Sequence, residues 1–120
     1  GPYRSVQFIT SASAVLASPE RLDYCVSKAG LSMFARCLAL RLAGDAIDVF
    51  EIRPGIIRTD MTSAVSARYD ALIEGGLVPA GRWGEPGDIA STSAALAAGR
   101  LSFATGSIID VGGGLHIPRL

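Results

Sequence analysis

The sequence is poor in metal-binding side chains, with one histidine, His116, and two cysteines, Cys25 and Cys37, among 120 residues. A structural zinc site takes four ligands, mostly cysteine and histidine, so this set is too small to build one. Cys25 and Cys37 fall in one predicted helix, where their spacing separates them by about 18 Å along the axis. Because a disulfide needs Cα atoms within about 7 Å, we expect two buried, reduced thiols.

The sequence also lacks an excess of charge and a long apolar run. Eleven basic and eleven acidic residues give a formal net charge of zero, and the arginines are spread along the chain. This pattern argues against nucleic-acid binding, which needs a basic stripe facing the phosphates. No apolar run approaches the ~20 residues that span a bilayer, and the N-terminus shows no signal-like segment. A cytoplasmic protein without a membrane partner is therefore expected.

What the sequence does have is an apolar composition and a regular alternation of element types. Hydrophobic residues make up 49% of the chain and charged residues 18%, which is typical of a globular protein. β-branched and aromatic runs predict strands, and apolar residues at three- and four-residue spacing predict helices. The predicted elements are a strand at 5–10, a helix at 24–42, a strand at 46–52, an irregular, partly helical excursion at 60–80, a helix at 85–99 and a strand at 106–111.

The long helix at 24–42 is predicted with an apolar face and a defined end. The apolar residues at the spacing of one helix face are Leu31, Phe34, Leu38 and Leu42. A turn is predicted at 18–20, before the helix. Gly44 is expected as the C-terminal cap, because glycine adopts a left-handed conformation without strain.

The alternation of strands with helix-length connections predicts parallel strands joined by right-handed crossovers. This is the βαβαβ unit of a Rossmann-type, doubly wound α/β sheet. Since there is no internal repeat or linker, residues 1–120 are expected to form a single partial domain. The chain supplies a neighbour for one side of the strand at 5–10 at most. Because a bare apolar edge promotes aggregation, we expect another segment to cover the second side.

A tyrosine and a lysine stand four residues apart near the start of the long helix. Tyr24 and Lys28 are expected one turn apart on the same face. An ammonium group held near a phenol favours the phenolate, which makes tyrosine a usable general acid or base. Ser11 ends the first strand, at the carboxyl edge where open α/β sheets bind ligands, and its hydroxyl could hold a substrate oxygen. Ser11, Tyr24 and Lys28 are the candidate catalytic residues.

Each of these motifs also has a purely structural interpretation. Helix surfaces often carry tyrosine and lysine at this spacing, and Ser11 could simply end a strand. Pro54 and Gly55 are compatible with an ordinary turn. The glycines at 112–114 are interpreted as a turn rather than a phosphate loop, because no helix is predicted after them. Three further side chains are interpreted as packing or surface residues: Tyr69, Trp83 and His116.

Taken together, these motifs resemble the C-terminal half of a short-chain dehydrogenase/reductase. The resemblance covers essentially the whole chain through Ser11, "YCVSK" at 24–28, "RPGIIRT" at 53–59 and "TGSIIDVGGG" at 105–114. It implies a Rossmann-type fold and hydride transfer between NADP or NAD and a carbonyl or alcohol. It further implies that Ser11 binds the substrate oxygen, Tyr24 exchanges the proton and Lys28 holds the nicotinamide ribose. Tyr24 and Lys28 are thus both expected to contact the cofactor.

The resemblance also implies a cofactor-binding segment after the second predicted strand. Pro54 and Gly55 would turn the chain around the nicotinamide. The backbone at Ile57 would meet the carboxamide, and the Thr59 hydroxyl would contact the carboxamide or a phosphate. The excursion at 60–80 matches the mobile substrate lid of the family.

Two features of the family are missing from this sequence. There is no glycine-rich loop for the adenosine half of the cofactor, and the catalytic asparagine of the family is absent. We therefore expect the N-terminal half to come from a longer polypeptide or from a second chain. A smaller departure is Gly112, which stands where the family usually has an aspartate, while Asp110 lies two residues earlier.

The sequence around the motifs is similar to bacterial 3-oxoacyl-acyl-carrier-protein reductases, in "SPERLDYCVSKAGLSM" at 18–33 and "RPGIIRTDMT" at 53–62. This narrows the hypothesis to reduction of a small carbonyl or acyl thioester substrate, with NADP slightly favoured. Sugar and polyol dehydrogenases share the three catalytic residues and stay open as alternatives, whereas the short C-terminal tail disfavours a sugar epimerase. The other alternative is a noncatalytic dimerisation module, because the family forms homo-oligomers through the helix at 24–42.

Overall fold

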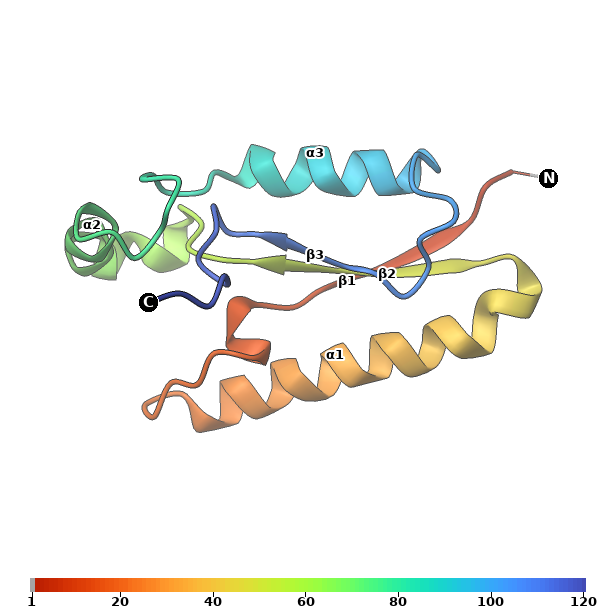
Figure 1. Ribbon diagram of the computed structural model, residues 1–120, viewed down its shortest axis with the longest axis horizontal. Coiled ribbons are helices and arrows are strands. Elements are labelled where there is room, and N and C mark those ends of the chain that lie inside the picture. Colours follow the sequence, from red (N-terminus) through yellow and green to blue (C-terminus); the bar gives the residue numbers. More distant parts are fainter. Residues whose placement is uncertain (1) are drawn as a thin grey trace.

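The computed structural model describes residues 2–120 and shows a three-stranded parallel sheet between two long helices (Figure 1). In chain order the elements are β1 (Ser5–Ile9), η1 (Ala12–Ala14), α1 (Leu22–Leu42), η2 (Ala43–Asp45), β2 (Asp48–Pro54), η3 (Asp60–Val65), α2 (Ser66–Glu74), α3 (Pro86–Ala97) and β3 (Ile108–Val111), where η marks a 3₁₀ helix. The sheet order is β1-β2-β3. The predicted α/β fold is confirmed, and every predicted element is present with boundaries shifted by a few residues.

The central strand β2 distributes its side chains to both faces of the sheet. Val49 packs with Ala35 and Ala39 of α1, whereas Phe50 and Ile52 pack with Leu96 of α3 on the opposite face. Successive strand residues point to opposite faces, so a strand covered on both sides is apolar at consecutive positions. Glu51 and Arg53 interrupt this pattern, and both are buried.

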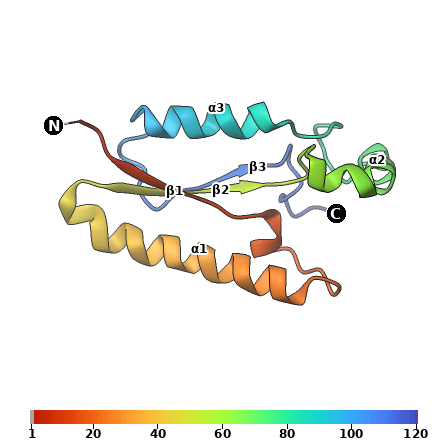
Figure 2. The ribbon, with the colours of Figure 1, turned by 180° about the vertical axis from the view of Figure 1, so that it is seen from behind.

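The prediction that both crossovers are right-handed is wrong for one of them. The strands advance in one direction from β1 to β3, yet α1 and α3 cover opposite faces of the sheet. Two connections of this kind must have opposite hands. The opposed views in Figures 1 and 2 show that the connection through α1 is right-handed and the one through α3 is left-handed. The rare hand, which alternation alone cannot predict, lets two helices cover both faces.

Three details of α1 also differ from the predictions. The fully buried residues of the face against the sheet are small, Ser32, Ala35 and Ala39. Of the predicted face, Leu38 and Leu42 are half-buried and pack against this core, whereas Phe34 is 54% exposed. Gly44 is not a left-handed cap, because the chain continues into η2 and Ala46 takes the positive φ of 57°. The thiols are free as predicted, but Cys37 is exposed and Cys25 is half-buried.

No helix within residues 2–120 is long and apolar enough to cross a membrane. The same residues contain no cluster of three or more histidine, cysteine or acidic side chains that could hold a metal ion.

Truncation of Leu96 tests the packing of α3. Leu96 is fully buried against Phe50 and Ile52, so Leu96→Ala should lower the free energy of unfolding by about 2–5 kcal/mol, since it removes buried contacts and leaves a cavity. Leu101→Ala, at a position 39% exposed, is the control and should change stability by less than about 0.5 kcal/mol. Equal losses in urea unfolding would contradict this packing.

Candidate active site

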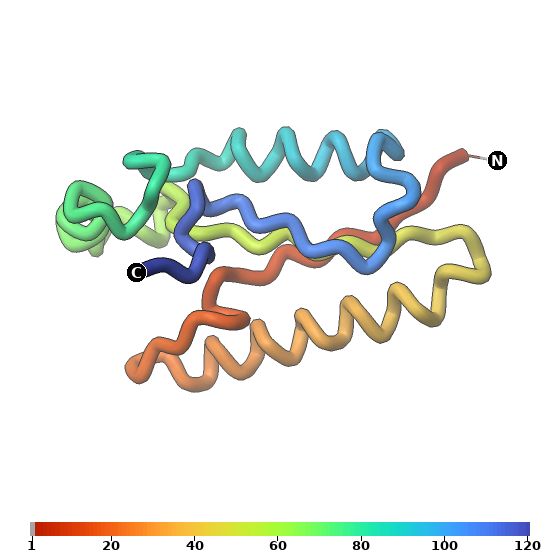
Figure 3. Tube along the Cα trace, viewed as in Figure 1, coloured from red at the N-terminus to blue at the C-terminus, as the bar shows by residue number. Residues whose placement is uncertain are grey.

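The candidate residues gather at the carboxyl ends of the three parallel strands. The turn after β1, the segment that follows β2 and the tail after β3 all lie at the same end of the molecule, beside α2 (Figure 3). The start of α1 lies at this end as well (Figure 1). Parallel strands bring their carboxyl ends to one edge, which is where such sheets bind ligands.

Ser11 lies two residues after the end of β1 and directly before the 3₁₀ turn η1. Its hydroxyl accepts a hydrogen bond from the Ser13 backbone N–H at 3.1 Å, which is a local turn bond. η1 packs against α1, the helix that carries Tyr24 and Lys28. The loop that joins η1 to α1 is held to the helix by a long contact of 3.9 Å between the Cys25 thiol and the Leu16 carbonyl. The fold therefore brings the turn of Ser11 against the helix of the other two candidates.

Tyr24 and Lys28 lie in the first two turns of α1, and both are half-buried. The Lys28 ammonium lies 5.6 Å from the centre of the Tyr24 ring, and the Arg21 guanidinium stacks over the same ring at 3.8 Å. Two cations thus lie close to one phenol ring. Cations are attracted to the face of an aromatic ring, which favours this arrangement. Arg21 was not among the predicted residues, because its position just before α1 became clear only with the helix boundary.

Pro54 is the last residue of β2, and Gly55 follows it beside the end of β3. The Gly55 N–H donates to the Val111 carbonyl at 3.0 Å, which extends the ladder between β2 and β3 by one bond. A Cβ atom at Gly55 would lie 2.8 Å from the Cα of Gly112, closer than side chains approach a backbone. Glycine is thus required here by the contact between two backbones, and a glycine at position 112 is part of that contact.

The backbone after Gly55 is tied to the loop before α3. Ile57 forms a parallel bridge with Gly84, through a bond from the Gly84 N–H to the Ile56 carbonyl at 2.9 Å and one from the Arg58 N–H to the Gly84 carbonyl at 2.8 Å. In a parallel bridge the flanking residues make the bonds, so the N–H of Ile57 points to the other side. Thr59 follows at the surface, where its N–H donates to the Thr62 hydroxyl at 2.9 Å.

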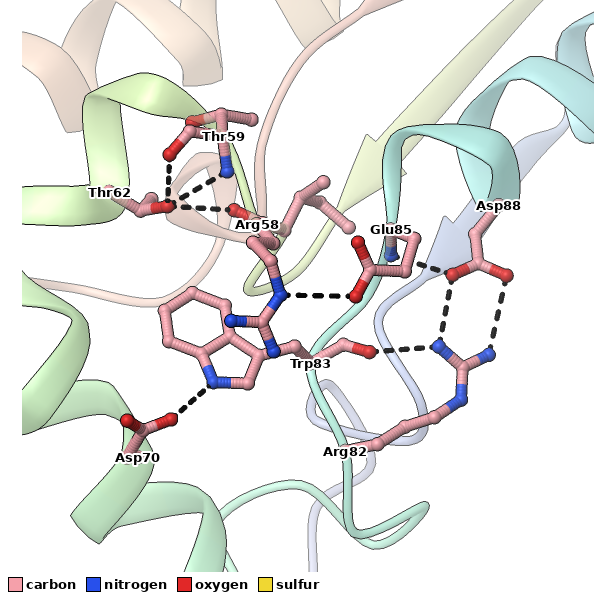
Figure 4. Close-up of polar contacts among 9 residues, drawn as sticks. Arg58, Thr59, Thr62, Asp70, Arg82, Trp83, Glu85 and Asp88 are labelled. Atoms are coloured by element: carbon pink, nitrogen blue, oxygen red, sulfur yellow. Dashed lines mark hydrogen bonds and ion pairs between the residues drawn. The ribbon is translucent and has the colours of Figure 1, made fainter.

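A cluster around Trp83 joins α2, the segment after β2 and the start of α3 (Figure 4). The Trp83 indole N–H donates to Asp70 of α2 at 2.6 Å, and the Tyr69 ring meets Trp83 edge to face at 5.7 Å. The Arg58 guanidinium lies over Trp83 at 4.8 Å and pairs with Glu85 at 3.1 Å. The interpretation of Tyr69 and Trp83 as packing residues agrees with these contacts. The cluster fixes α2 over the carboxyl ends of the strands.

Loss of the Trp83–Asp70 bond should loosen α2. Asp70→Ala leaves the partly buried N–H of Trp83 without its charged acceptor, so we expect a loss of about 1 kcal/mol in the free energy of unfolding. We also expect a red shift of the fluorescence of Trp83, the single tryptophan. Glu74→Ala, at the exposed end of α2, is the matched control and should change neither. An unshifted spectrum together with unchanged stability for Asp70→Ala would contradict the role of this bond.

An open pocket of about 360 Å³ lies between the start of α3 and the chain after β3. Its wall contains Arg82 and Asp88, which pair at 3.0 Å (Figure 4). The Arg82 guanidinium and the Glu85 backbone N–H hold the pKa of the Asp88 carboxyl below its usual value. The pocket does not include Ser11, Tyr24 or Lys28, so it is separate from the candidate catalytic group.

The tail after β3 behaves as predicted for a turn. Gly113 and Gly114 have positive φ angles of 64° and 93°, and the Leu115 N–H bonds back to the Gly112 carbonyl at 3.2 Å. His116 is exposed, and its ring lies 3.7 Å from Asp110.

A buried polar network lies under the candidate site and was not predicted. Glu51 on β2 accepts from the Thr10 hydroxyl at 2.5 Å, the Ser32 hydroxyl at 2.6 Å and Arg53 Nε at 2.9 Å. A second nitrogen of Arg53 donates to the Ser32 hydroxyl at 3.0 Å. Burial by itself would raise the pKa of Glu51, but the bonds from Ser32, Thr10 and Arg53 outweigh it and hold the pKa below the ordinary value. Arg53 lies outside the strand predicted at 46–52, so the pairing of Glu51 with Arg53 on one face of β2 became visible only with the observed strand Asp48–Pro54.

The three-stranded parallel sheet with its flanking helices is the Rossmann-like fold of the short-chain dehydrogenases/reductases. Residues 2–116 match a family model described as Enoyl-(Acyl carrier protein) reductase, and the chain belongs to this family. It is 38% identical over 109 residues to the 3-oxoacyl-[acyl-carrier-protein] reductase of Haemophilus influenzae, a match that covers 91% of this chain and 45% of that protein. The chain thus spans about half the length of the curated relatives it matches.

Solved structures agree with this assignment. A 3-oxoacyl-[acyl-carrier protein] reductase from Brucella melitensis in complex with NAD is 62% identical, with a TM-score of 0.97 over 99% of this chain and 47% of that chain. A putative 2-deoxy-D-gluconate 3-dehydrogenase from Agrobacterium tumefaciens with bound NADP is 32% identical, with a TM-score of 0.86 over 92% of this chain and 46% of that chain. The predicted resemblance to the C-terminal half of the family is confirmed, and the two structures hold different nicotinamide cofactors.

Proposed function

We propose that this chain carries the catalytic residues of an oxidoreductase that transfers hydride between a nicotinamide cofactor and a carbonyl or alcohol. The narrower proposal is reduction of a 3-oxoacyl thioester, which the names of the relatives support. NADPH is proposed as the favoured donor from the sequence resemblance alone. The observation that carries the proposal is the packing of the Ser11 turn against the helix of Tyr24 and Lys28, at the carboxyl edge of a parallel sheet.

In the proposed mechanism each of the three residues acts on one atom. The Ser11 hydroxyl donates to the carbonyl oxygen and holds it beside the Tyr24 phenol. Tyr24 donates its proton to that oxygen as negative charge develops there, and the positive charge of Lys28 favours the phenolate that remains. When bound, a reduced nicotinamide would supply the hydride to the carbonyl carbon. Lys28 would also hold the ribose hydroxyls.

The segment from Pro54 to Thr59 fits a nicotinamide group. The outward N–H of Ile57 offers a donor to a carboxamide oxygen, while the bridge to Gly84 keeps that backbone in place. The close contact of Gly55 with Gly112 leaves no side chain between the ends of β2 and β3. Thr59 stands at the surface, where its hydroxyl would reach the carboxamide or a phosphate.

The adenosine half of the cofactor would be held by residues outside this chain. Within residues 2–120, β1 pairs with β2 alone, so its other edge is free to accept a neighbouring strand. We propose that this strand belongs to the glycine-rich half of the domain, supplied by a longer polypeptide or a second chain.

The test is to incubate the intact protein, with any preceding or accompanying chain, with an acetoacetyl thioester and each reduced cofactor. Loss of nicotinamide absorbance at 340 nm is expected, faster with NADPH. Activity on a sugar or polyol with oxidised cofactor, but not on the thioester, would replace the narrow proposal by the dehydrogenase alternative. No reaction on any carbonyl or alcohol would contradict the function.

A noncatalytic association module is the second candidate, and the outer face of α1 favours it. Large apolar side chains stand exposed at helical spacing along this face: Leu22, Val26, Met33 and Leu40. Exposed apolar stripes of this kind pack against a second helix, so a homo-oligomer through α1 is proposed in either case. Val26→Glu should convert the assembly to smaller species in sedimentation. If the intact protein binds no nicotinamide cofactor and still self-associates, the module is supported.

A further inference from the structure

The buried carboxylate of Glu51 bonds to residues that adjoin each candidate catalytic segment. Thr10, which donates to Glu51, directly precedes Ser11 at the end of β1. Ser32, which also donates to Glu51, lies one helical turn after Lys28 on the same face of α1. One side chain on β2 therefore touches both the strand that presents Ser11 and the helix that presents Lys28.

Arg53 closes the same network on the side of the cofactor segment. It directly precedes Pro54, and it bonds to both Glu51 and Ser32. The four side chains are nearly inaccessible, with exposed fractions of 4% for Thr10, 2% for Ser32, 2% for Glu51 and 8% for Arg53. Each side chain bonds to another member, so the network is closed and directional.

The rest of the contact between α1 and the sheet is apolar. Ala35 and Ala39 pack on Val49, and Leu38 and Leu42 pack against the same cluster. Apolar packing is not directional. Hydrogen bonds depend on distance and angle, so the bonds of Ser32 to Glu51 and Arg53 restrict sliding and rotation of the helix.

Stability does not explain why an ion pair occupies this place. Removing two charges from water is unfavourable, and apolar side chains of similar volume are often as stabilising as a buried pair. Phe50 and Ile52, on the other face of the same strand, show that apolar residues pack well at this depth. The role of the network is therefore indicated by its neighbours. Its members adjoin Ser11, the start of α1 and the segment that begins at Pro54.

We propose that Glu51 is a positioning residue that fixes the start of α1 against the ends of β1 and β2, and so sets the arrangement of Tyr24 and Lys28 relative to Ser11. The inference rests on the proposed function for its kinetic consequence. Its structural consequence, a fixed register between α1 and the sheet, is independent of the reaction.

The first experiment separates positioning from stability. Glu51→Leu combined with Arg53→Met replaces the pair by apolar side chains and should leave the intact protein folded. Its unfolding free energy should fall somewhat, because the Thr10 and Ser32 hydroxyls lose their acceptor, but should stay well above that of Arg53→Met alone. We expect kcat of thioester reduction to fall about tenfold to a hundredfold, because small displacements in an active site lower rates by such factors. The KM of the thioester should change less. An unchanged kcat in the folded double variant would overturn the proposal.

Two further variants test whether a general loss of stability, rather than a displaced helix, lowers kcat. Glu51→Gln keeps the volume and one acceptor oxygen, and its kcat should fall between those of the parent and the double variant. Val49→Ala, two positions earlier on the same face of β2, lowers stability without touching the network, so it should keep kcat within about twofold of the parent. A loss of kcat in Val49→Ala as large as in the double variant would mean that general loosening is responsible and would overturn the proposal.

Crystal structures supply a result that does not depend on turnover. In the double variant, Ser32 should shift relative to Val49 by about 0.5 Å or more, which is the tolerance of a catalytic arrangement. An unshifted α1 would overturn the positioning role whatever the activity. If parent and Val49→Ala both fail to reduce any carbonyl while α1 shifts in the double variant, the positioning stands and the proposed function fails.

Discussion

Tyr24→Phe should lower kcat of carbonyl reduction by about 10²- to 10⁴-fold, because it removes the proposed proton donor and leaves the ring in place. The ring would keep its stacking with Arg21, so the stability of α1 and the affinity for reduced cofactor should change little. Steady-state kinetics with an acetoacetyl thioester and a cofactor-binding titration measure the two quantities.

Tyr3→Phe is the matched control for this substitution. Tyr3 donates its hydroxyl to Asp48 at 2.7 Å near the amino ends of the strands, away from the carboxyl edge. Its loss should leave kcat unchanged. Full activity of Tyr24→Phe would remove Tyr24 from the mechanism, and equal losses in both variants would point to a general effect on folding.

Arg53→Met should have the largest effect on stability, a loss of about 3–5 kcal/mol at neutral pH, because it leaves the buried Glu51 carboxylate without its positive partner. Chemical unfolding of the intact protein measures this loss. The companion Glu51→Leu/Arg53→Met variant should recover most of it, since no unpaired charge remains. A single variant as stable as the parent would show that Glu51 is not held as an anion by Arg53.

The pH dependence of stability should differ in sign between the parent and Arg53→Met. In the parent the pKa of Glu51 is held below its ordinary value, so its contribution is present above the unfolded pKa and is lost as the pH falls through the folded pKa. In Arg53→Met burial dominates and should raise that pKa, so stability is lost as the pH rises through it. The difference between the two proteins should therefore be largest near neutral pH and should shrink towards pH 4. A constant difference would contradict this account.

Local sequence patterns predicted the helices and strands and their order well. They did not predict the hand of the connection through α3 or the turn between α1 and β2. Strand composition and helical spacing suffice for β1, α1, β2, α3 and β3. The left-handed connection was not predicted, because the hand depends on which face α3 buries and not on any local residue. The cap at Gly44 was predicted wrongly for a similar reason, since the turn at Ala46 is set by how η2 leads the chain into β2.

For the site, the sequence supplied the residues and the structure supplied their neighbours. Ser11, Tyr24 and Lys28 could be proposed from spacing and resemblance alone. Their roles stay proposals, as do those of Pro54 and the rest of the cofactor segment. Contacts between distant segments, such as Glu51 with Ser32 or Trp83 with Asp70, required the fold, because each joins residues from different elements.

The parallel register of the sheet also governs how the chain reaches this fold. Ser5 pairs with Asp48, and Glu51 pairs with Ile108, so each strand pairing must close a loop that contains a whole helix. Closing such loops costs entropy before any contact forms, which makes folding slow compared with that of helical proteins. During synthesis at about 5–20 residues per second, β3 follows β1 by roughly 5–20 s. For part of that interval Phe50 and Ile52 of β2 lack the cover that α3 later gives them, so their apolar side chains are open to contacts with other chains until α3 and β3 are synthesised.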